Sequence, residues 1–167
     1  MVSISYRFTI LPLLFIKIKE GKAYTVSHRF ESVASDASVQ LLFNNPDTSG
    51  KTAYIVMIEV TSTGQGWVDI YRDNTVTASG TPLTPFNLNL GSTNTSSMTV
   101  EYGGTYTLGA QSLNTVCPGG SGVRAIGAAT EVGETAEIPS GHNILIQFTN
   151  RSASAEDASI RILWWEE

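Results

Sequence analysis

The chain lacks most of the residues that catalysis and metal binding require. Its 167 residues include one cysteine and two histidines, His28 and His142, which are far apart in the sequence. Neither histidine belongs to a His-x-His or His-Glu-x-x-His arrangement, so the sequence predicts no metal site, no cofactor and no catalytic residues. No intrachain disulfide can form because Cys117 is alone. We interpret Cys117 as a partly buried small residue in a loop, not as a nucleophile.

Charge is also scarce. Charged residues make up 15% of the chain, against about 25% in typical soluble domains, and the formal net charge is −5. The lysines at positions 17, 19 and 22 alternate with isoleucines, which is typical of the solvated face of a strand. Since no basic stripe could neutralise phosphates, the sequence predicts no nucleic-acid partner. Ser, Thr, Asn and Gly replace the missing charge, as in extracellular β proteins and closely packed subunits.

The sequence has no apolar run long enough to span a bilayer, so it predicts no membrane span. Residues Phe8–Ile16 form an apolar run with the length of a signal-peptide core, with Arg7 before it and Ala23 as a candidate cleavage residue. Against cleavage, residues 17–22 carry three lysines and a glutamate where small neutral residues are expected. We therefore expect residues 1–21 to be retained as an apolar arm or extra strand, ahead of a single β-sandwich domain at residues 22–167.

The rest of the chain consists of short β-branched and aromatic runs bounded by turn residues. An N-terminal hairpin is predicted around Glu20-Gly21, between residues 16–19 and 24–30. A second, tight hairpin is predicted at Gly103-Gly104, and Gly109–Gly122 is predicted to be a loop. With about ten strands and no repeat of fixed period, the chain is expected to be an all-β sandwich or barrel. The further strands are predicted at residues 38–43, 53–60, 67–72, 86–90, 98–102, 105–108, 123–126, 135–138, 144–149 and 159–165.

The acidic and glycosylation motifs have weak specificity. Glu131, Glu134 and Glu137 would align on a helix but alternate faces in a strand, and we interpret them as a solvated rim. Asn94-Thr-Ser96 and Asn150-Arg-Ser152 are N-glycosylation sequons, which arise easily by chance in a chain rich in Ser and Thr.

Three segments together resemble a known family: Phe43–Tyr54, Glu59–Tyr71, and Ile138–Asn150 running into Trp164–Glu167. They look like the small jelly-roll proteins in virions of tailed phages and archaeal viruses, including capsid decoration, spike and fibre-head subunits. The resemblance covers roughly residues 24–167 and omits the apolar N-terminus. It implies an antiparallel, jelly-roll-like β-sandwich that is non-catalytic, often trimeric, and located in the virion or on an extracellular surface.

The leading hypothesis is therefore a structural subunit that self-associates, as a homo-oligomer with a trimer favoured, and joins other virion or surface-assembly proteins. A retained apolar arm would be an aggregation hazard in water, so we expect it to dock on a neighbouring subunit, with packing on its own domain as a near-equal alternative. The subunit-interface residues predicted in this way are Phe8, Ile10, Leu11, Leu13, Leu14, Phe15, Ile16 and Ile18.

The alternative hypothesis is a carbohydrate- or receptor-binding β-sandwich module, because ligands stack on exposed aromatic rings. Successive strand residues point to opposite faces. At most one of Trp164 and Trp165 is therefore expected in the core, and the other is expected to meet a partner or solvent. The residues predicted to contact a ligand or partner are Trp67, Tyr71, Trp164 and Trp165.

Overall fold

The computed structural model describes residues 13–118 and 136–167, which are mostly β-strand and include one short helix at residues 13–19. The strands are β1 (Ala23–Val33), β2 (Ser38–Asn44), β3 (Ala53–Ser62), β4 (Gly66–Arg72), β5 (Thr75–Ala78), β6 (Thr81–Leu83), β7 (Phe86–Asn87), β8 (Thr99–Tyr102), β9 (Thr105–Thr107), β10 (Ala110–Cys117), β11 (Ala136–Ile138), β12 (Asn143–Asn150) and β13 (Glu156–Glu166).

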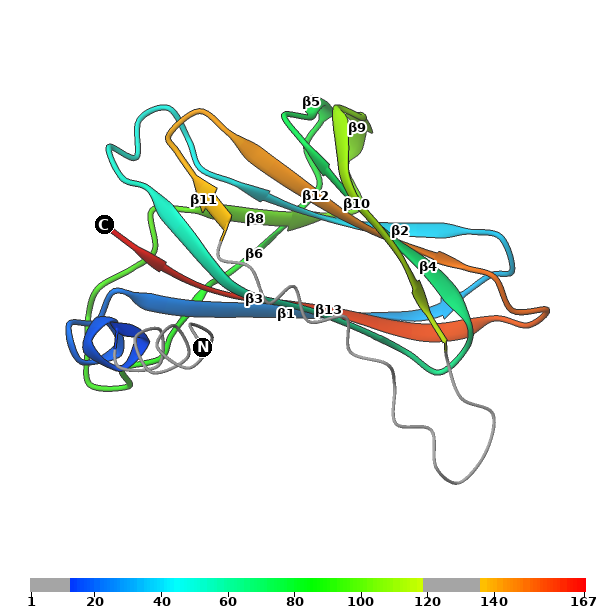
Figure 1. The fold of residues 1–167 in the computed structure, drawn as a ribbon, viewed down its shortest axis with the longest axis horizontal. Coiled ribbons are helices and arrows are strands. Elements are labelled where there is room, and N and C mark those ends of the chain that lie inside the picture. The colour runs from blue at the N-terminus through cyan, green and yellow to red at the C-terminus, as the bar shows by residue number, and fades with distance from the viewer. Residues whose placement is uncertain (1–12, 119–135) are drawn as a thin grey trace, which may run out of the picture.

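Two antiparallel sheets pack face to face as a sandwich (Figure 1). One sheet has the order β11-β3-β13-β1-β7 and the other has the order β10-β4-β12-β2-β8-β6. Without the insertion that carries β5 to β9, eight strands remain, which can be counted from one to eight along the chain. One sheet then has the order first, eighth, third, sixth, and the other has the order second, seventh, fourth, fifth. This is the strand order of a jelly roll. The predicted all-β, antiparallel, jelly-roll-like sandwich is confirmed.

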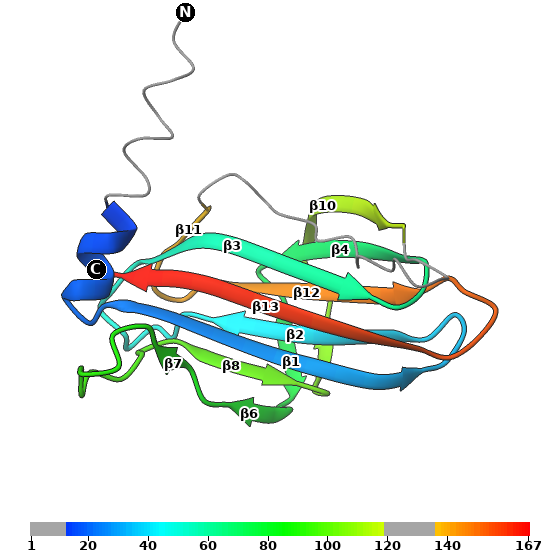
Figure 2. The same cartoon turned by 90° about the horizontal axis from the view of Figure 1, so that it is seen from below.

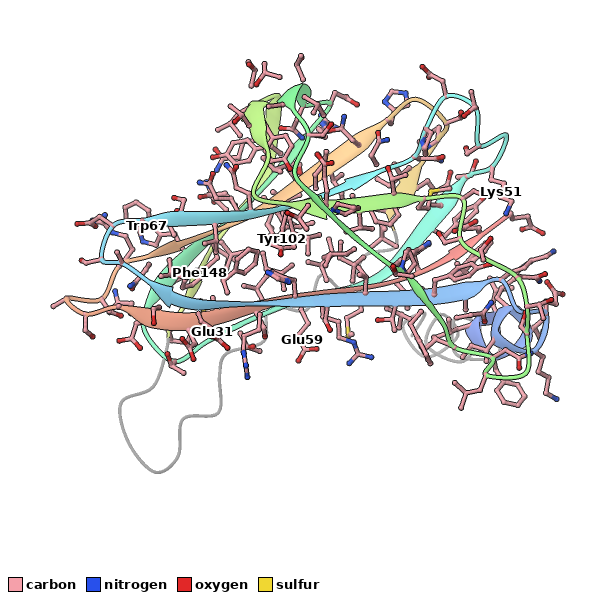
Figure 3. The ribbon with its side chains drawn as sticks, turned by 180° about the vertical axis from the view of Figure 1, so that it is seen from behind. Glu31, Lys51, Glu59, Trp67, Tyr102 and Phe148 are labelled. Atoms are coloured by element: carbon pink, nitrogen blue, oxygen red, sulfur yellow. The ribbon has the colours of Figure 1, made fainter. Side chains whose placement is uncertain are left out.

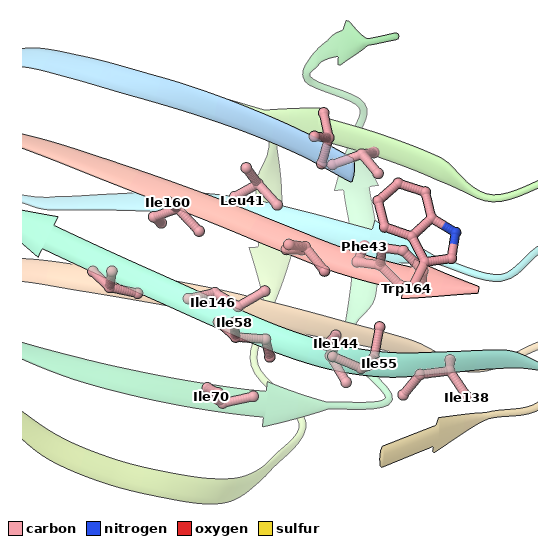
Figure 4. Close-up of a cluster of buried hydrophobic side chains, with 14 of the residues drawn as sticks. Leu41, Phe43, Ile55, Ile58, Ile70, Ile138, Ile144, Ile146, Ile160 and Trp164 are labelled. Atoms are coloured by element: carbon pink, nitrogen blue, oxygen red, sulfur yellow. The ribbon is translucent and has the colours of Figure 1, made fainter. Parts of the chain in front are cut away.

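The core lies between the two sheets and follows the alternation of the strands. On β12, Ile144 and Ile146 face inward, and on β13 Ile160 and Trp164 meet them from the other sheet (Figure 4). Phe148 of β12 belongs to the same buried cluster. All five side chains are buried. Burying one large apolar side chain stabilises a fold by about 1.5–3 kcal/mol, so each of these residues contributes substantially to stability.

The insertion between β4 and β10 closes one edge of the sandwich. It places β8 against β2 and β6 against β8 in one sheet, and β7 against β1 in the other. In Figure 1, β5 and β9 lie above the outer face of the sheet that contains β12 and β2. The insertion thus pairs with part of the edge formed by β1 and β2, at Tyr24 and Thr25 of β1 and at Leu41–Asn44 of β2, and the short strands β7 and β6 end the two sheets there.

The predicted hairpin at Gly103-Gly104 is wrong. Gly103 does adopt a positive φ of 70°, as a tight turn requires. However, the strands on either side of it pair elsewhere, since β8 pairs with β2 and β6 while β9 pairs with β5. The long strand β2 offers β8 a more extensive edge than a three-residue hairpin partner could, and this tertiary pairing overrides the local turn signal.

The predicted N-terminal hairpin is also wrong, because residues 13–19 are helical. The helix ends in a Schellman motif, in which the N–H of Gly21 donates to the carbonyl of Ile18 and the N–H of Lys22 donates to the carbonyl of Lys17, both at 2.9 Å. Gly21 has a φ of 67°. A glycine that can end a helix can equally make a hairpin turn, so the local sequence does not distinguish the two.

The segment predicted to be a loop at 109–122 contains an eight-residue strand, β10. Its composition is polar, but it pairs with β4 from Ala110 to Cys117 and forms the edge of its sheet. Only one face of an edge strand needs apolar residues, and here Leu113 and the buried Cys117 supply them. The strand predicted at 123–126 lies outside the described residues.

Candidate interaction surfaces

The two histidines occupy different surroundings. His28 lies on β1 and stacks on Tyr102, with ring centroids 3.7 Å apart, and it meets Phe30 edge to face at 4.6 Å. Burial lowers the pKa of His28. His142 lies in the turn before β12, with its Nδ1 2.7 Å from Oδ1 of the exposed Asp73. Across residues 13–118 and 136–167, no group of three or more His, Cys, Asp or Glu side chains could hold a metal ion.

Exposed apolar side chains gather at one end of the sandwich, where the helix meets the segment 86–94. We call this set the apolar end patch, and its members are Leu13, Phe15, Ile16, Phe86 and Leu90. Leu90 is 82% exposed and Phe15 is 57% exposed. Large apolar side chains that are exposed together mark interaction sites more often than isolated ones do.

Asparagine side chains hold the two parts of the patch together. The Nδ2 of Asn89 donates to the carbonyl of Lys19 at 3.1 Å, and the Nδ2 of Asn87 donates to the carbonyl of Gly21 at 3.0 Å. These bonds join the end of the helix to the segment that carries Phe86 and Leu90. The helix and this segment are therefore parts of one surface, at the end of the sandwich where the C-terminus also lies (Figure 2).

Lys17 anchors the helix to the sandwich. Its Nζ donates to Oε1 of Glu167 at 2.9 Å and lies 5.0 Å from the ring centroid of Trp165, while the side chain as a whole is buried. The hydrogen bond to Glu167 is the main cause of a raised pKa at Lys17. The described part of the N-terminal arm thus packs on its own domain.

Both tryptophans of β13 are buried, with Trp164 at 0% and Trp165 at 7% exposure. Trp164 lies in the core, with Tyr24 and Phe43 beside its ring. Trp165 points to the outer face, where Tyr54 stacks on it with ring centroids 3.8 Å apart. The expectation that one of the two rings must meet a partner or solvent is wrong, because the helix and Tyr54 cover the outer ring.

The predicted interface residues divide into three groups. Leu13, Phe15 and Ile16 are exposed and belong to the apolar end patch. Leu14 and Ile18 are partly buried on the side of the helix that also carries Lys17. The remaining three, Phe8, Ile10 and Leu11, lie outside the described residues.

Trp67 is the exposed tryptophan, at 47%. It lies on β4, on the outer face of its sheet, and the guanidinium carbon of Arg151 is 4.3 Å from its ring centroid. Arg151 follows β12 and is itself paired with Asp36. Tyr71, four residues further along β4, is only partly exposed, and burial raises its pKa.

A shallow groove with a volume of about 330 Å³ runs along β4 and β10 beside Trp67. We call it the Trp67 groove, and it is lined by Trp67, Asp69, Asn114, Thr115 and Val116. Tyr71 does not line it. Figure 3 shows Trp67 and Lys51 at opposite ends of the sandwich, and Lys51 lies at the end that carries the C-terminal residues.

No protein-family model matches the sequence, and no curated protein matches it either. In the described part of the chain, no helix has the length and apolar composition needed to cross a membrane.

Sequence reasoning missed several residues of these surfaces. Phe86 and Leu90 were predicted as alternating strand residues, and only their place beside the helix makes them part of a patch. The sequence predicts a loop at Asn114 and Val116, although the period-two alternation of Leu113, Thr115 and Cys117 is a signal for the strand. No local signal connects Arg151 to Trp67.

Proposed function

We propose that the protein is a non-enzymatic structural subunit of a virion or another extracellular assembly, and that it acts by self-association through the apolar end patch. The observation that carries the proposal is that Leu13, Phe15, Ile16, Phe86 and Leu90 are exposed on two segments, the helix and residues 86–94, that hydrogen bonds join at one end of the sandwich. Removing apolar surface from water contributes about 25 cal/mol per Å², so a patch of this kind favours association.

The patch is held rigidly, which lowers the entropic cost of association. Lys17 fixes the helix through Glu167 and Trp165, and Asn87 and Asn89 fix the neighbouring segment. The partner surface therefore exists before any second subunit arrives.

The fold and composition agree with this role. The insertion ends both sheets of the jelly-roll sandwich in very short strands, β7 and β6, and short edge strands limit uncontrolled edge pairing. The small share of charged residues suits a subunit that is closely packed in an assembly. The partners that we propose are further copies of the chain, with a trimer favoured, and other virion or surface-assembly proteins.

Light scattering on the full chain tests the proposal. We expect the wild-type protein to have the mass of a small multiple of the chain, and the double variant Phe15→Ser, Ile16→Ser to have the mass of one chain with the same β circular dichroism. The matched control is Val76→Ser, Leu108→Ser, which changes two exposed apolar residues away from the patch, at 41% and 43% exposure. It should keep the wild-type mass. A wild-type protein that stays monomeric at high concentration would overturn the proposal.

A further inference from the structure

We propose that the Trp67 groove binds a neutral saccharide. This function goes beyond self-association and uses a different part of the surface, because Trp67 lies at the opposite end of the sandwich from Lys51 and the C-terminal residues (Figure 3). The argument rests on one fixed aromatic ring, the polar groups beside it and the charge of the groove.

The indole of Trp67 is supported on one side and open on the other. In the sheet order β10-β4-β12, the groove lies on the β10 side of Trp67, since only β4 and β10 contribute lining residues. Arg151 comes from the end of β12, on the other side of β4, and stacks on the ring at 4.3 Å. The ion pair between Arg151 and Asp36 holds that guanidinium in place. The ring is thus oriented before a ligand binds, which reduces the entropy lost on binding.

The groove offers the two kinds of contact that a sugar ring needs. A pyranose has apolar C–H groups on its faces and hydroxyl groups around its rim, so it stacks on an indole while its rim makes hydrogen bonds. Asp69 lies two residues from Trp67 on the same face of β4, and its Oδ1 accepts a hydrogen bond of 2.7 Å from Nε2 of Gln111. That bond orients the carboxylate. The amide of Asn114, which faces Asp69 across the strand pair, adds a second polar group that can donate and accept.

Charge and size select the class of ligand. The lining includes the carboxylate of Asp69 and no lysine or arginine, and the nearby guanidinium of Arg151 is paired with Asp36. The whole chain has a net charge of −5. Anionic ligands such as nucleic acids or sulfated glycans are therefore disfavoured. A volume of about 330 Å³ is small for a ligand pocket and suits one or two sugar rings.

The experiment titrates the full-length protein with neutral oligosaccharides of glucose, galactose, mannose, xylose and N-acetylglucosamine, by calorimetry and tryptophan fluorescence. Because Trp164 and Trp165 are buried, a change in emission on binding and protection from acrylamide quenching report on Trp67. We expect at least one of these sugars to bind. We expect Trp67→Ala to lower the association constant by about tenfold or more, as the loss of a stacking contact does.

Two further variants test whether binding depends on the Trp67 groove or on the protein surface in general. Asp69→Asn keeps the shape of the side chain but removes its charge, and should weaken binding. Val76→Ala, at an exposed apolar position outside the groove, should bind as the wild type does. The proposal is overturned if none of the five sugar classes binds, if Trp67→Ala binds as tightly as the wild type, or if Trp67→Ala instead changes the mass measured by light scattering. The last result would mean that the face is a contact between copies of the chain.

Discussion

The indole Nε1 of Trp164 donates a hydrogen bond of 3.1 Å to Oε1 of Glu166, two residues further along β13. Both side chains are buried, with 0% and 1% exposure. The same carboxylate accepts hydrogen bonds from Oγ of Ser96 at 2.5 Å, from the N–H of Ser97 at 3.1 Å and from Nζ of Lys51 at 3.1 Å. The carboxylate of Glu166 thus accepts the hydrogen bond of the largest core side chain, Trp164, and joins β13 to the loops that carry Lys51 and Ser96-Ser97.

Replacing Glu166 with glutamine should lower the free energy of unfolding by about 2 kcal/mol, because the neutral amide loses the charge that four donors share. Urea unfolding followed by circular dichroism measures the change. The control is Glu31→Gln, which breaks the exposed pair of Glu31 with Arg29 and should cost less than about 0.5 kcal/mol. If both variants lower the free energy of unfolding equally, the buried carboxylate stabilises the fold no more than the exposed one does.

His28 should make the protein less stable in acid. Burial lowers the pKa of His28 below its ordinary value of about 6.5, so the unfolded chain binds a proton at a higher pH than the folded chain does. Above about pH 6.5, His28 has no effect on the free energy of unfolding. As the pH falls from there toward the folded-state pKa, protonation of His28 in the unfolded chain lowers the free energy of unfolding progressively. Unfolding curves between pH 7.5 and pH 5, chosen to span the unperturbed histidine pKa of about 6.5, should show the loss.

In His28→Leu, the part of the acid destabilisation that is due to this group should disappear, because leucine does not titrate. The remaining slope then belongs to other groups. If the variant keeps the full wild-type slope between those pH values, His28 does not cause the effect.

Asn150 begins a glycosylation sequon, but its side chain has a structural role and joins three backbone groups by hydrogen bonds. Its side chain is fully buried, and Nδ2 donates to the carbonyls of Val33 and Ser154, both at 2.8 Å. Its Oδ1 accepts a bond of 2.8 Å from the N–H of Ser152. Asn150→Ala should lower the melting temperature and cost about 1–3 kcal/mol, since it removes three hydrogen bonds to backbone groups, of which the bond to the Val33 carbonyl is buried. The control Asn114→Ala, at an exposed position, should melt as the wild type does; a similar loss there would contradict the assignment.

Most strands were predictable because burial on one face imposes a period of two. Residues 144–149 and 159–165 show that period plainly, and both match strands that face the core, β12 and β13. The strand β10 was not predicted because an edge strand needs few apolar residues. It forms because its backbone pairs with β4. The helix at residues 13–19 was not predicted because four alternating residues before a glycine fit a hairpin and a helix end equally well.

The sequence by itself determined that the protein is an all-β sandwich with an apolar N-terminus, since local periodicity and turn residues specify where strands form. Only the tertiary structure decided which strands pair, because pairs such as Tyr24 with Trp164 join residues far apart in the chain. It also decided which apolar residues are exposed. Alternation assigns Trp165 to the outer face, but whether that face is covered depends on the helix that Lys17 holds against it. Whether an outward-facing side chain is covered depends on how the elements assemble, and no local pattern encodes it.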